Sequence, residues 1–488
     1  MFARIREEED GVAMIVALMV CFVVLLLGVV VMAQATHNVQ QAGYDRKRLT
    51  AIGGAEAGID YMYNYFQKTS AATVSLDPVS SAVSIGTFPN TTSYDTSVTY
   101  YGNSTGTVPS VWPFSNSNYP SSAKVVSVGT SSDGTKRVME TFMVLHPVLA
   151  GTSGAIVTNS DTQFSGNFTV SGVDSDVYVL SGNFTALSGL ESINGSIYVP
   201  QGSANIGTNV AISGQVFARD LVTLNHPQLV ILGDVKSSTA GVTKTAGTVL
   251  GQIHYCPPGA APAGAIADCP SPVPGSSVTF PQLTYNQTTW GTLQSDGTKW
   301  YQEPIPSQPG KTQCDVAQGM IEAGGANTTP PAGYTGVVYY LDSGCNYLNS
   351  PSAGTISMNG DLAIVAPGGI TLANSAAFTG VGSSRKLILM APWPPVGSPC
   401  TSPMVQVSGN TDFINVTGFV YSSCKVDMSN NNAHFTGQVV GQQVTIGNLF
   451  GMTYQEMLVP GMDISGFRED VAYIREVTCQ NPASATCT

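Results

Sequence analysis

The chain has 488 residues and a formal net charge of −12, and only 10% of its residues are charged. Globular chains usually carry about 25% charged residues, so Ser, Thr, Asn, Gln and the backbone must solvate most of this surface. Cations for phosphate contacts are scarce, which argues against a nucleic-acid partner. Intrinsic disorder is also disfavoured, because 43% of the residues are apolar.

A single uncharged apolar run lies near the N-terminus, over residues 12–32. As a helix it would be about 30 Å long, which is the thickness of the hydrocarbon core of a bilayer. A secretory signal peptide has a shorter apolar run, with a small-residue cleavage site after it. The run therefore predicts a single-pass membrane protein with an extracytoplasmic C-terminal region.

The helix is expected to continue past the membrane. Residues 33–66 contain no proline, and apolar or small residues recur there at spacings of three and four, as they do on one helix face. These residues are Leu49, Ile52, Ala55, Ile59, Met62 and Phe66. The pattern predicts one helix over residues 12–66.

A stripe of small residues lies on the second half of this helix and comprises Ala51, Gly54, Ala55 and Gly58. A glycine weakens a helix by up to about 1 kcal/mol relative to alanine, while small residues let two helix backbones approach closely. We therefore expect the stripe to pack against a neighbouring helix. A plain membrane anchor with a juxtamembrane helix is the alternative interpretation.

Gly11 stands directly before the apolar run, after a short charged leader, and the sequence continues from it as GVAMIVAL. Together with the string AEAG at 55–58, this region resembles the N-terminus of PilX-type minor pilins over about residues 7–66. The resemblance implies a type III prepilin signal, in which a prepilin peptidase cuts the leader 1–11 between Gly11 and Val12. It also implies that the mature helix packs with other pilin subunits in a type IV pilus. Major pilins carry Glu at the fifth mature position, and Val16 stands there, which favours a tip or initiation role.

The remainder is predicted to be mainly β-structure. Residues 67–150 form a small β-rich region, in which alternating runs at 97–101 and 136–145 indicate an antiparallel sheet that packs on the helix. Residues 151–255 and 336–478 alternate short apolar runs with Gly, Asn and Ser, and we interpret them as two parts of a right-handed parallel β-solenoid. A β-sandwich is the alternative, and no fixed repeat period is evident. The second part also resembles the solenoid domain that accompanies PilX-type N-termini.

Residues 256–335 separate the two solenoid parts. They are rich in Pro, Gly, Ala and Thr, a composition that favours an extended excursion with little regular structure.

Cys21 lies in the apolar run, and eight cysteines lie outside it. These eight are Cys256, Cys269, Cys314, Cys345, Cys400, Cys424, Cys479 and Cys487. Sequential pairing would give four local disulfides, of which the first would pin the excursion and the last would close a loop in the tail 479–488. Eight cysteines nevertheless allow 105 connectivities. Disulfides indicate an oxidising compartment. A metal site is the alternative, but no CxxC spacing occurs.

Few residues suggest catalysis. The string NTD at 410–412 matches a fragment of the polygalacturonase signature, but the rest of that signature is absent. Asp174 and Asp176 stand two apart, as paired catalytic carboxylates could, although their VDSD context favours a turn. The five histidines lack an acid or nucleophile at a motif spacing. We therefore predict a protein that is not an enzyme, with no catalytic residue, cofactor or metal.

The sequence thus predicts a structural minor pilin or pilus-assembly component that displays a large β-solenoid head at the cell surface. Its expected partners are the membrane, other pilin subunits and a prepilin peptidase. Adhesion to a surface or glycan is a further hypothesis, based on the Tyr, Asn and Thr content of the head. The alternatives are a membrane-anchored adhesin outside a pilus and an anchored β-helix enzyme that acts on polysaccharides.

Overall fold

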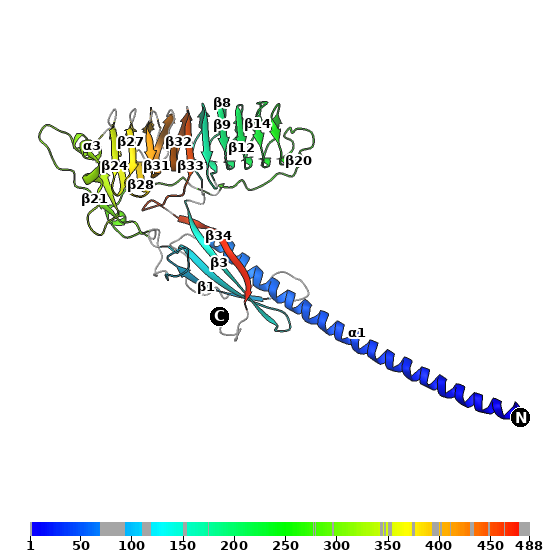
Figure 1. Cartoon of the computed structure of the whole chain (residues 1–488). Coiled ribbons are helices and arrows are strands. Elements are labelled where there is room, and N and C mark those ends of the chain that lie inside the picture. The colour runs from blue at the N-terminus through cyan, green and yellow to red at the C-terminus, as the bar shows by residue number, and fades with distance from the viewer. Residues whose placement is uncertain are drawn as a thin grey trace.

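The structure of the chain is a computed structural model. It describes residues 2–68, 93–109, 119–149, 154–173, 175–276, 278, 280–294, 297–341, 345, 348–349, 354–372, 376–392, 400, 403–409, 411–429, 434–447, 449–462 and 464–477. Figure 1 shows one long helix, a small sheet around its C-terminal half, and a row of short strands above that sheet.

Helix α1 (Phe2–Lys68) is continuous over 67 residues, which corresponds to about 100 Å at 1.5 Å per residue. The predicted long helix is therefore confirmed, and it begins ten residues earlier than expected. No proline or helix-capping glycine motif interrupts residues 2–11, so the leader segment continues the same helix.

The small sheet has four antiparallel strands in the order β1, β2, β3, β34. Their bounds are Ser93–Tyr101, Ser122–Thr130, Lys136–Leu149 and Ile464–Val477. The fourth strand comes from the C-terminal end of the chain. It pairs with β3 from Val138↔Val477 to Leu149↔Ile464. The structure thus differs from the expectation that residues 336–478 all belong to the solenoid, because β3 supplies a free edge that β34 completes.

The solenoid is inserted between these two neighbouring strands, and its first part has three strands in each coil. The first face is formed by β4 (Ile156–Thr158), β7 (Val177–Val179), β10 (Ile197–Val199), β13 (Val216–Ala218), β16 (Val235–Ser237) and β19 (Ile253–Tyr255). The second face is formed by β5 (Thr162–Ser165), β8 (Phe184–Ser188), β11 (Ala204–Ile206), β14 (Val222–Leu224) and β17 (Val242–Lys244). The third face is formed by β6 (Phe168–Ser171), β9 (Leu190–Ile193), β12 (Asn209–Ile212), β15 (Val230–Ile231) and β18 (Thr248–Val249).

Parallel pairing fixes the repeat that the sequence did not reveal. Ile197 pairs with Val177 on one side and with Val216 on the other, and Val235 pairs with Val216 and Ile253. One coil of the first part therefore takes 18 to 23 residues, from Ala204↔Val222 at the short end to Phe168↔Glu191 at the long end. The prediction of a parallel β-solenoid is confirmed, and the sandwich alternative is wrong.

The excursion carries the chain from β20 (Ile266–Ala267) to the far end of the solenoid, beneath it in Figure 1. It contains α2 (Gln287–Trp290), β21 (Trp300–Gln302), α3 (Gln313–Ala323) and a 3₁₀ turn at Gly325–Thr328.

The second part of the solenoid then winds back toward the first part. Its first face is formed by β22 (Gly336–Tyr340), β25 (Asp361–Val365) and β28 (Arg385–Ala391). Its second face is formed by β23 (Leu348–Asn349), β26 (Ile370–Leu372) and β29 (Pro403–Val407). Strands β24, β27 and β30 (Gly354–Met358, Ala376–Gly380, Asp412–Ile414) form a separate sheet. The long strands β31 (Val416–Ser429) and β32 (His434–Gly447) run along two faces, and β33 (Phe450–Tyr454) follows. Strand β32 pairs in parallel with β4 and β5, so the last coil of the chain joins the first.

Two layers of apolar side chains hold the solenoid together. The interior is filled by stacked buried residues such as Phe164, Phe184 and Val222. Outside the first face, Tyr178, Tyr198 and Phe217 are also buried, because residues of the excursion and of the segment before β34 cover them. The covering side chains include Val273, Phe280, Leu283, Trp290, Met457 and Val459. The excursion therefore serves as a strap on the first face, in addition to linking the two parts.

Candidate functional site

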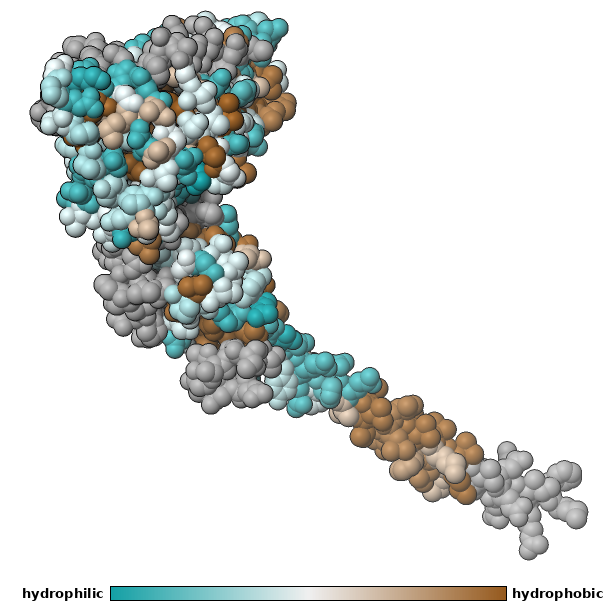
Figure 2. All heavy atoms as spheres, turned by 60° about the vertical axis from the view of Figure 1, so that its left-hand side comes forward, coloured by the Kyte–Doolittle hydropathy of each residue, from teal (hydrophilic) through white to brown (hydrophobic). Residues whose placement is uncertain are grey.

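The apolar half of α1 is exposed along its length. The large apolar side chains between Met14 and Met32 are 50–75% exposed, and the helix is long and apolar enough to cross a membrane. Figure 2 shows this apolar run standing clear of the head, with a hydrophilic stretch of helix between them. Such an uncovered apolar surface is costly in water, and it is suited to cover by a bilayer or by other apolar helices.

The other half of α1 docks on the small sheet. Ile59, Met62 and Phe66 are buried against Val125, Met139 and Met143 of the sheet, and Phe66 meets Tyr100 edge to face with ring centroids 6.1 Å apart. Alternating residues of the strands point toward the helix, as expected for a sheet with one buried face.

Glycine permits a backbone contact at the start of this interface. A Cβ built on Gly129 of β2 would collide with the carbonyl oxygen of Ala51 and with the backbone nitrogen of Ala55. Further along, a Cβ on Gly58 would collide with Ser127. The small-residue stripe is therefore covered by the sheet of the same chain. This corrects the expectation that Ala51, Gly54, Ala55 and Gly58 pack against a neighbouring helix.

Ion pairs tie the helix to the sheet where it leaves the head. The Lys47 ammonium lies 2.9 Å from the carboxylate of Asp133, and Arg48 lies 2.8 Å from Glu476 of β34. Hydrogen bonds from Ser131 and then from Lys47 hold the pKa of Asp133 well below its usual range. Lys47 and Arg48, which follow the apolar run, thus bind the small sheet and fix the direction in which α1 leaves it.

A buried carboxylate organises the opposite face of the sheet. Glu140 of β3 is 1% exposed, and it accepts hydrogen bonds from Tyr473 at 2.8 Å and Arg475 at 2.7 Å, while Lys124 lies at 2.6 Å. Burial raises the pKa of Glu140, but the hydrogen bonds from Lys124, Tyr473 and Arg475 outweigh it, so the pKa lies below its ordinary value. Because Tyr473 and Arg475 belong to β34, this cluster anchors the returning strand.

The structure distributes the other predicted site residues along the chain. Gly11 and Val12 lie within α1, about 40 residues before its docked half, and Val16 is exposed. Leu49, expected on the buried face, is 68% exposed, whereas Ala51 is fully buried. The buried face of the helix thus begins at Ala51 and not at Leu49, because the sheet covers the helix only from residue 51 onward.

Three disulfides join cysteines that are neighbours along the chain: Cys256–Cys269, Cys314–Cys345 and Cys400–Cys424. Cys21 has a free, exposed thiol. Cys479, Cys487 and the tail 479–488 lie outside the described residues. The first disulfide closes the last coil of the first part, and the second ties α3 to the region before β23.

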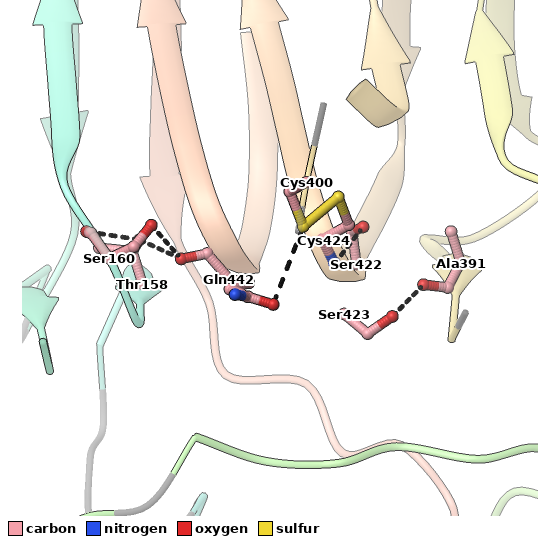
Figure 3. The surroundings of a disulfide bond; sticks show 8 residues. All are labelled: Thr158, Ser160, Ala391, Cys400, Ser422, Ser423, Cys424 and Gln442. Carbon is pink, nitrogen blue, oxygen red and sulfur yellow. Dashed lines mark hydrogen bonds between the residues drawn. A yellow bond between two sulfur atoms is a disulfide. The ribbon is translucent and has the colours of Figure 1, made fainter. Parts of the chain in front are cut away.

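The third disulfide lies near the join between the two solenoid parts (Figure 3). There the backbone carbonyl of Gln442, in β32, accepts hydrogen bonds from the hydroxyls of Thr158 at 3.2 Å and Ser160 at 2.9 Å. The backbone N–H of Asn159 donates to the same carbonyl at 3.0 Å. These bonds close the corner after β4 onto the last coil of the chain.

The acids considered for catalysis do not converge. The carboxylate of Asp176 accepts the backbone N–H of Ser196 at 2.6 Å, which is a corner contact between successive coils. Asp412 is exposed on β30, and Asp174 lies outside the described residues. Among the residues that the structure describes, no three His, Cys, Asp or Glu side chains are grouped so that they could hold a metal ion.

Sequence reasoning missed the sheet side of this site. Strand β2 carries Gly129, and the three valines of its string SAKVVSVGT, which favour a strand, are the local signal that could have found it. The role of Glu140 was not visible, because its partners Tyr473 and Arg475 are more than 330 residues away.

No protein-family model matches the sequence, and no curated protein matches it. One solved structure to which the chain is similar is the crystal structure of the competence-associated pilin ComZ from Thermus thermophilus. The identity is 11% and the TM-score 0.25, over 88% of this chain and 97% of that chain. A likeness at that TM-score does not assign a function to this chain, which must be inferred from the geometry of the chain itself.

Proposed function

We propose that the chain is a PilX-type minor pilin, a structural subunit that enters a type IV pilus through α1 and displays the solenoid outside the cell. The observation that carries this proposal is the division of α1. One face of residues 51–66 is covered by the sheet of the same chain, whereas the apolar side chains between Met14 and Met32 have no cover within the described residues.

This division suits a subunit that exchanges lipid for other helices. The docked half and its ion pairs at Lys47 and Arg48 hold the head rigidly on the rod. The exposed half then offers an apolar surface that can be covered first by a bilayer and afterwards by sister helices. An anchor that stays in the membrane needs no such firm coupling between its membrane helix and its head.

Two further parts of the proposal depend on the sequence. A prepilin peptidase would cut between Gly11 and Val12 to free the helix. Val16 supplies no carboxylate for the new N-terminal amine of a neighbour, which supports a place at or near the tip.

The test is to express the full chain in a bacterium that assembles type IV pili and to shear the surface fibres from the cells. Wild-type chain should appear in the sheared fraction, and Gly11→Leu should stay in the membrane at full length. Gly43→Leu is the matched control, because nothing lies within 4 Å of Gly43. If wild-type chain and Gly11→Leu both remain in the membrane fraction, the protein is an anchor outside the pilus.

A further inference from the structure

The second face of the solenoid carries an unbroken row of outward-pointing polar side chains. Cα pairing links one residue in each successive coil, across the join between the two parts. This polar row consists of Thr371, Gln406, Asp427, Thr445, Gln163, Thr185, Asn205, Thr223 and Thr243. Neighbouring strands lie about 4.8 Å apart, so the row is about 38 Å long.

Core packing on both sides fixes the direction of eight of the nine side chains, and Thr243 follows the buried Val242. Phe184 and Ala186 flank Thr185 and are buried in the interior, so Thr185 must point outward. The same alternation holds at Thr223, between Val222 and Leu224. Because inner strands of the row are hydrogen-bonded on both sides, the row is a rigid and regular array.

Most of the hydrogen-bonding capacity of the polar row is left open, although the Oδ1 atoms of Asn205 and Asp427 are buried. Within the described part of the chain, none of its nine side chains makes a hydrogen bond, whereas polar residues at the corners bond to the next coil. Asp161, for example, accepts the backbone N–H of Asn183 at 2.8 Å. The corresponding row on the third face is interrupted by Gly451, Ala211 and Val230.

The chemistry of the polar row limits what it can bind. Eight of its nine side chains are uncharged hydroxyls or amides that both donate and accept hydrogen bonds, and Asp427 is the ninth. The row lacks the aromatic and aliphatic anchors typical of protein interfaces. Its single charge is negative, as is the net charge of the chain, so a polyanion would be repelled.

We propose that the polar row is a docking surface for an extended, neutral, hydroxyl-rich polysaccharide, which lies along the solenoid axis and bonds to successive coils. This deepens the proposed function and depends on it, because the row meets such a polymer only if the head is displayed outside the cell. The first face cannot serve in this way, since the strap covers it.

The test is co-sedimentation of the purified full chain, in detergent, with insoluble cellulose, chitin and cross-linked dextran, and with insoluble cross-linked carboxymethylcellulose as an anionic counterpart. The test variant is Thr185→Val/Thr223→Val/Thr445→Val, which removes three hydroxyls and keeps a β-branched shape. Wild-type chain should bind at least one neutral polymer more tightly than the anionic one. The triple variant should bind that polymer at least tenfold more weakly.

The matched control is Thr169→Val/Thr248→Val/Thr355→Val, which removes three exposed hydroxyls elsewhere on the solenoid. It should bind as wild type does. The proposal is overturned if wild-type chain binds no neutral polymer, if it prefers the anionic one, or if the two triple variants bind equally. Shearing of wild-type chain in surface fibres tests the proposed function separately, so failure of one is distinguishable from failure of the other.

Discussion

At the scale of single residues, Glu191 is the least expected feature of the fold. It is 3% exposed and points into the solenoid, where its Cα partners in the neighbouring coils are the buried Phe168 and Val210. Neither carboxyl oxygen has a hydrogen-bond partner among the described residues. Burial raises the pKa of Glu191 to about 8, so the side chain is protonated in the folded state at neutral pH.

This burial makes the stability of the solenoid depend on pH. Well below pH 4.5 the side chain is neutral in both the folded and the unfolded state. As the pH rises from 4.5 toward 8, only the unfolded chain ionises, so the free energy of unfolding falls. Glu191→Gln removes that loss, and it should raise the melting temperature at pH 8 but hardly at pH 4. The difference corresponds to at most about 5 kcal/mol. Thermal unfolding followed by circular dichroism at both pH values measures it.

The control for that measurement is Glu56→Gln, on the exposed side of α1. It should shift the melting temperature equally little at both pH values. If Glu191→Gln lowers the melting temperature by the same amount at pH 4 and at pH 8, Glu191 is not a buried, protonated acid.

The sequence predicted individual residues well only where local spacing determines them. Ala55, Ile59, Met62 and Phe66 are buried as the helical spacing required, but Leu49 is exposed. Glu191 falls in the string LESI, which gives no sign that its carboxyl is enclosed. Such burial depends on the residues one coil before and after, about 20 positions away.

At the scale of elements, the contact between α1 and β2 depends on a missing side chain. Gly129→Ala places a Cβ against the backbone of Ala51 and Ala55, and backbone atoms cannot move aside as a flexible side chain can. The helix must then shift away from the sheet, at a cost typical of overpacking, about 1–3 kcal/mol. We expect a lower melting temperature, measured by circular dichroism.

The matched control is Gly53→Ala, on the same helix with nothing within 4 Å. It should leave the melting temperature unchanged or raise it, because alanine favours the helix by about 1 kcal/mol over glycine. Equal effects of the two substitutions would mean that the helix does not rest on Gly129 as described.

Elements were predictable in kind and much less so in extent. The long helix and the solenoid texture followed from composition and from runs of apolar residues. Strands of two or three residues, such as β15 and β18, have too few positions for any alternation to be recognised. Their length is set by the pairing with the coils before and after, so the repeat of 18 to 23 residues becomes evident only in three dimensions.

At the scale of the whole molecule, the solenoid is an insertion into a small domain. Leu149 and Ile464 are Cα partners at the ends of β3 and β34, so the two strands can be joined directly. Replacing residues 150–463 by Asn-Gly, which favours a tight hairpin turn, should leave α1 and the four-stranded sheet folded. Cooperative thermal unfolding of the shortened chain in detergent would confirm it.

A second deletion, of residues 151–478, provides the contrast. It removes β34 together with Tyr473 and Arg475, so Glu140 loses two of its partners and β3 gains a free edge. This chain should aggregate or unfold without a cooperative transition. Identical behaviour of the two deletions would show that β34 is not needed by the small domain.

The sequence could not reveal this arrangement. Pairing of β34 with β3 links residues more than 300 positions apart, and the join of β32 to β4 links residues about 280 apart. No local pattern specifies such partners, whereas the membrane run and the Gly-rich coils are local features and were predicted.

The most direct test of the whole proposal is the intact mass of the chain recovered from a host that assembles type IV pili. If α1 is a detachable rod that leaves the bilayer for a fibre, the mature chain begins at Val12, and residues 1–11 are absent from it. A chain that retains Met1 and residues 2–11, in cells whose other pilins are processed, would contradict the proposal.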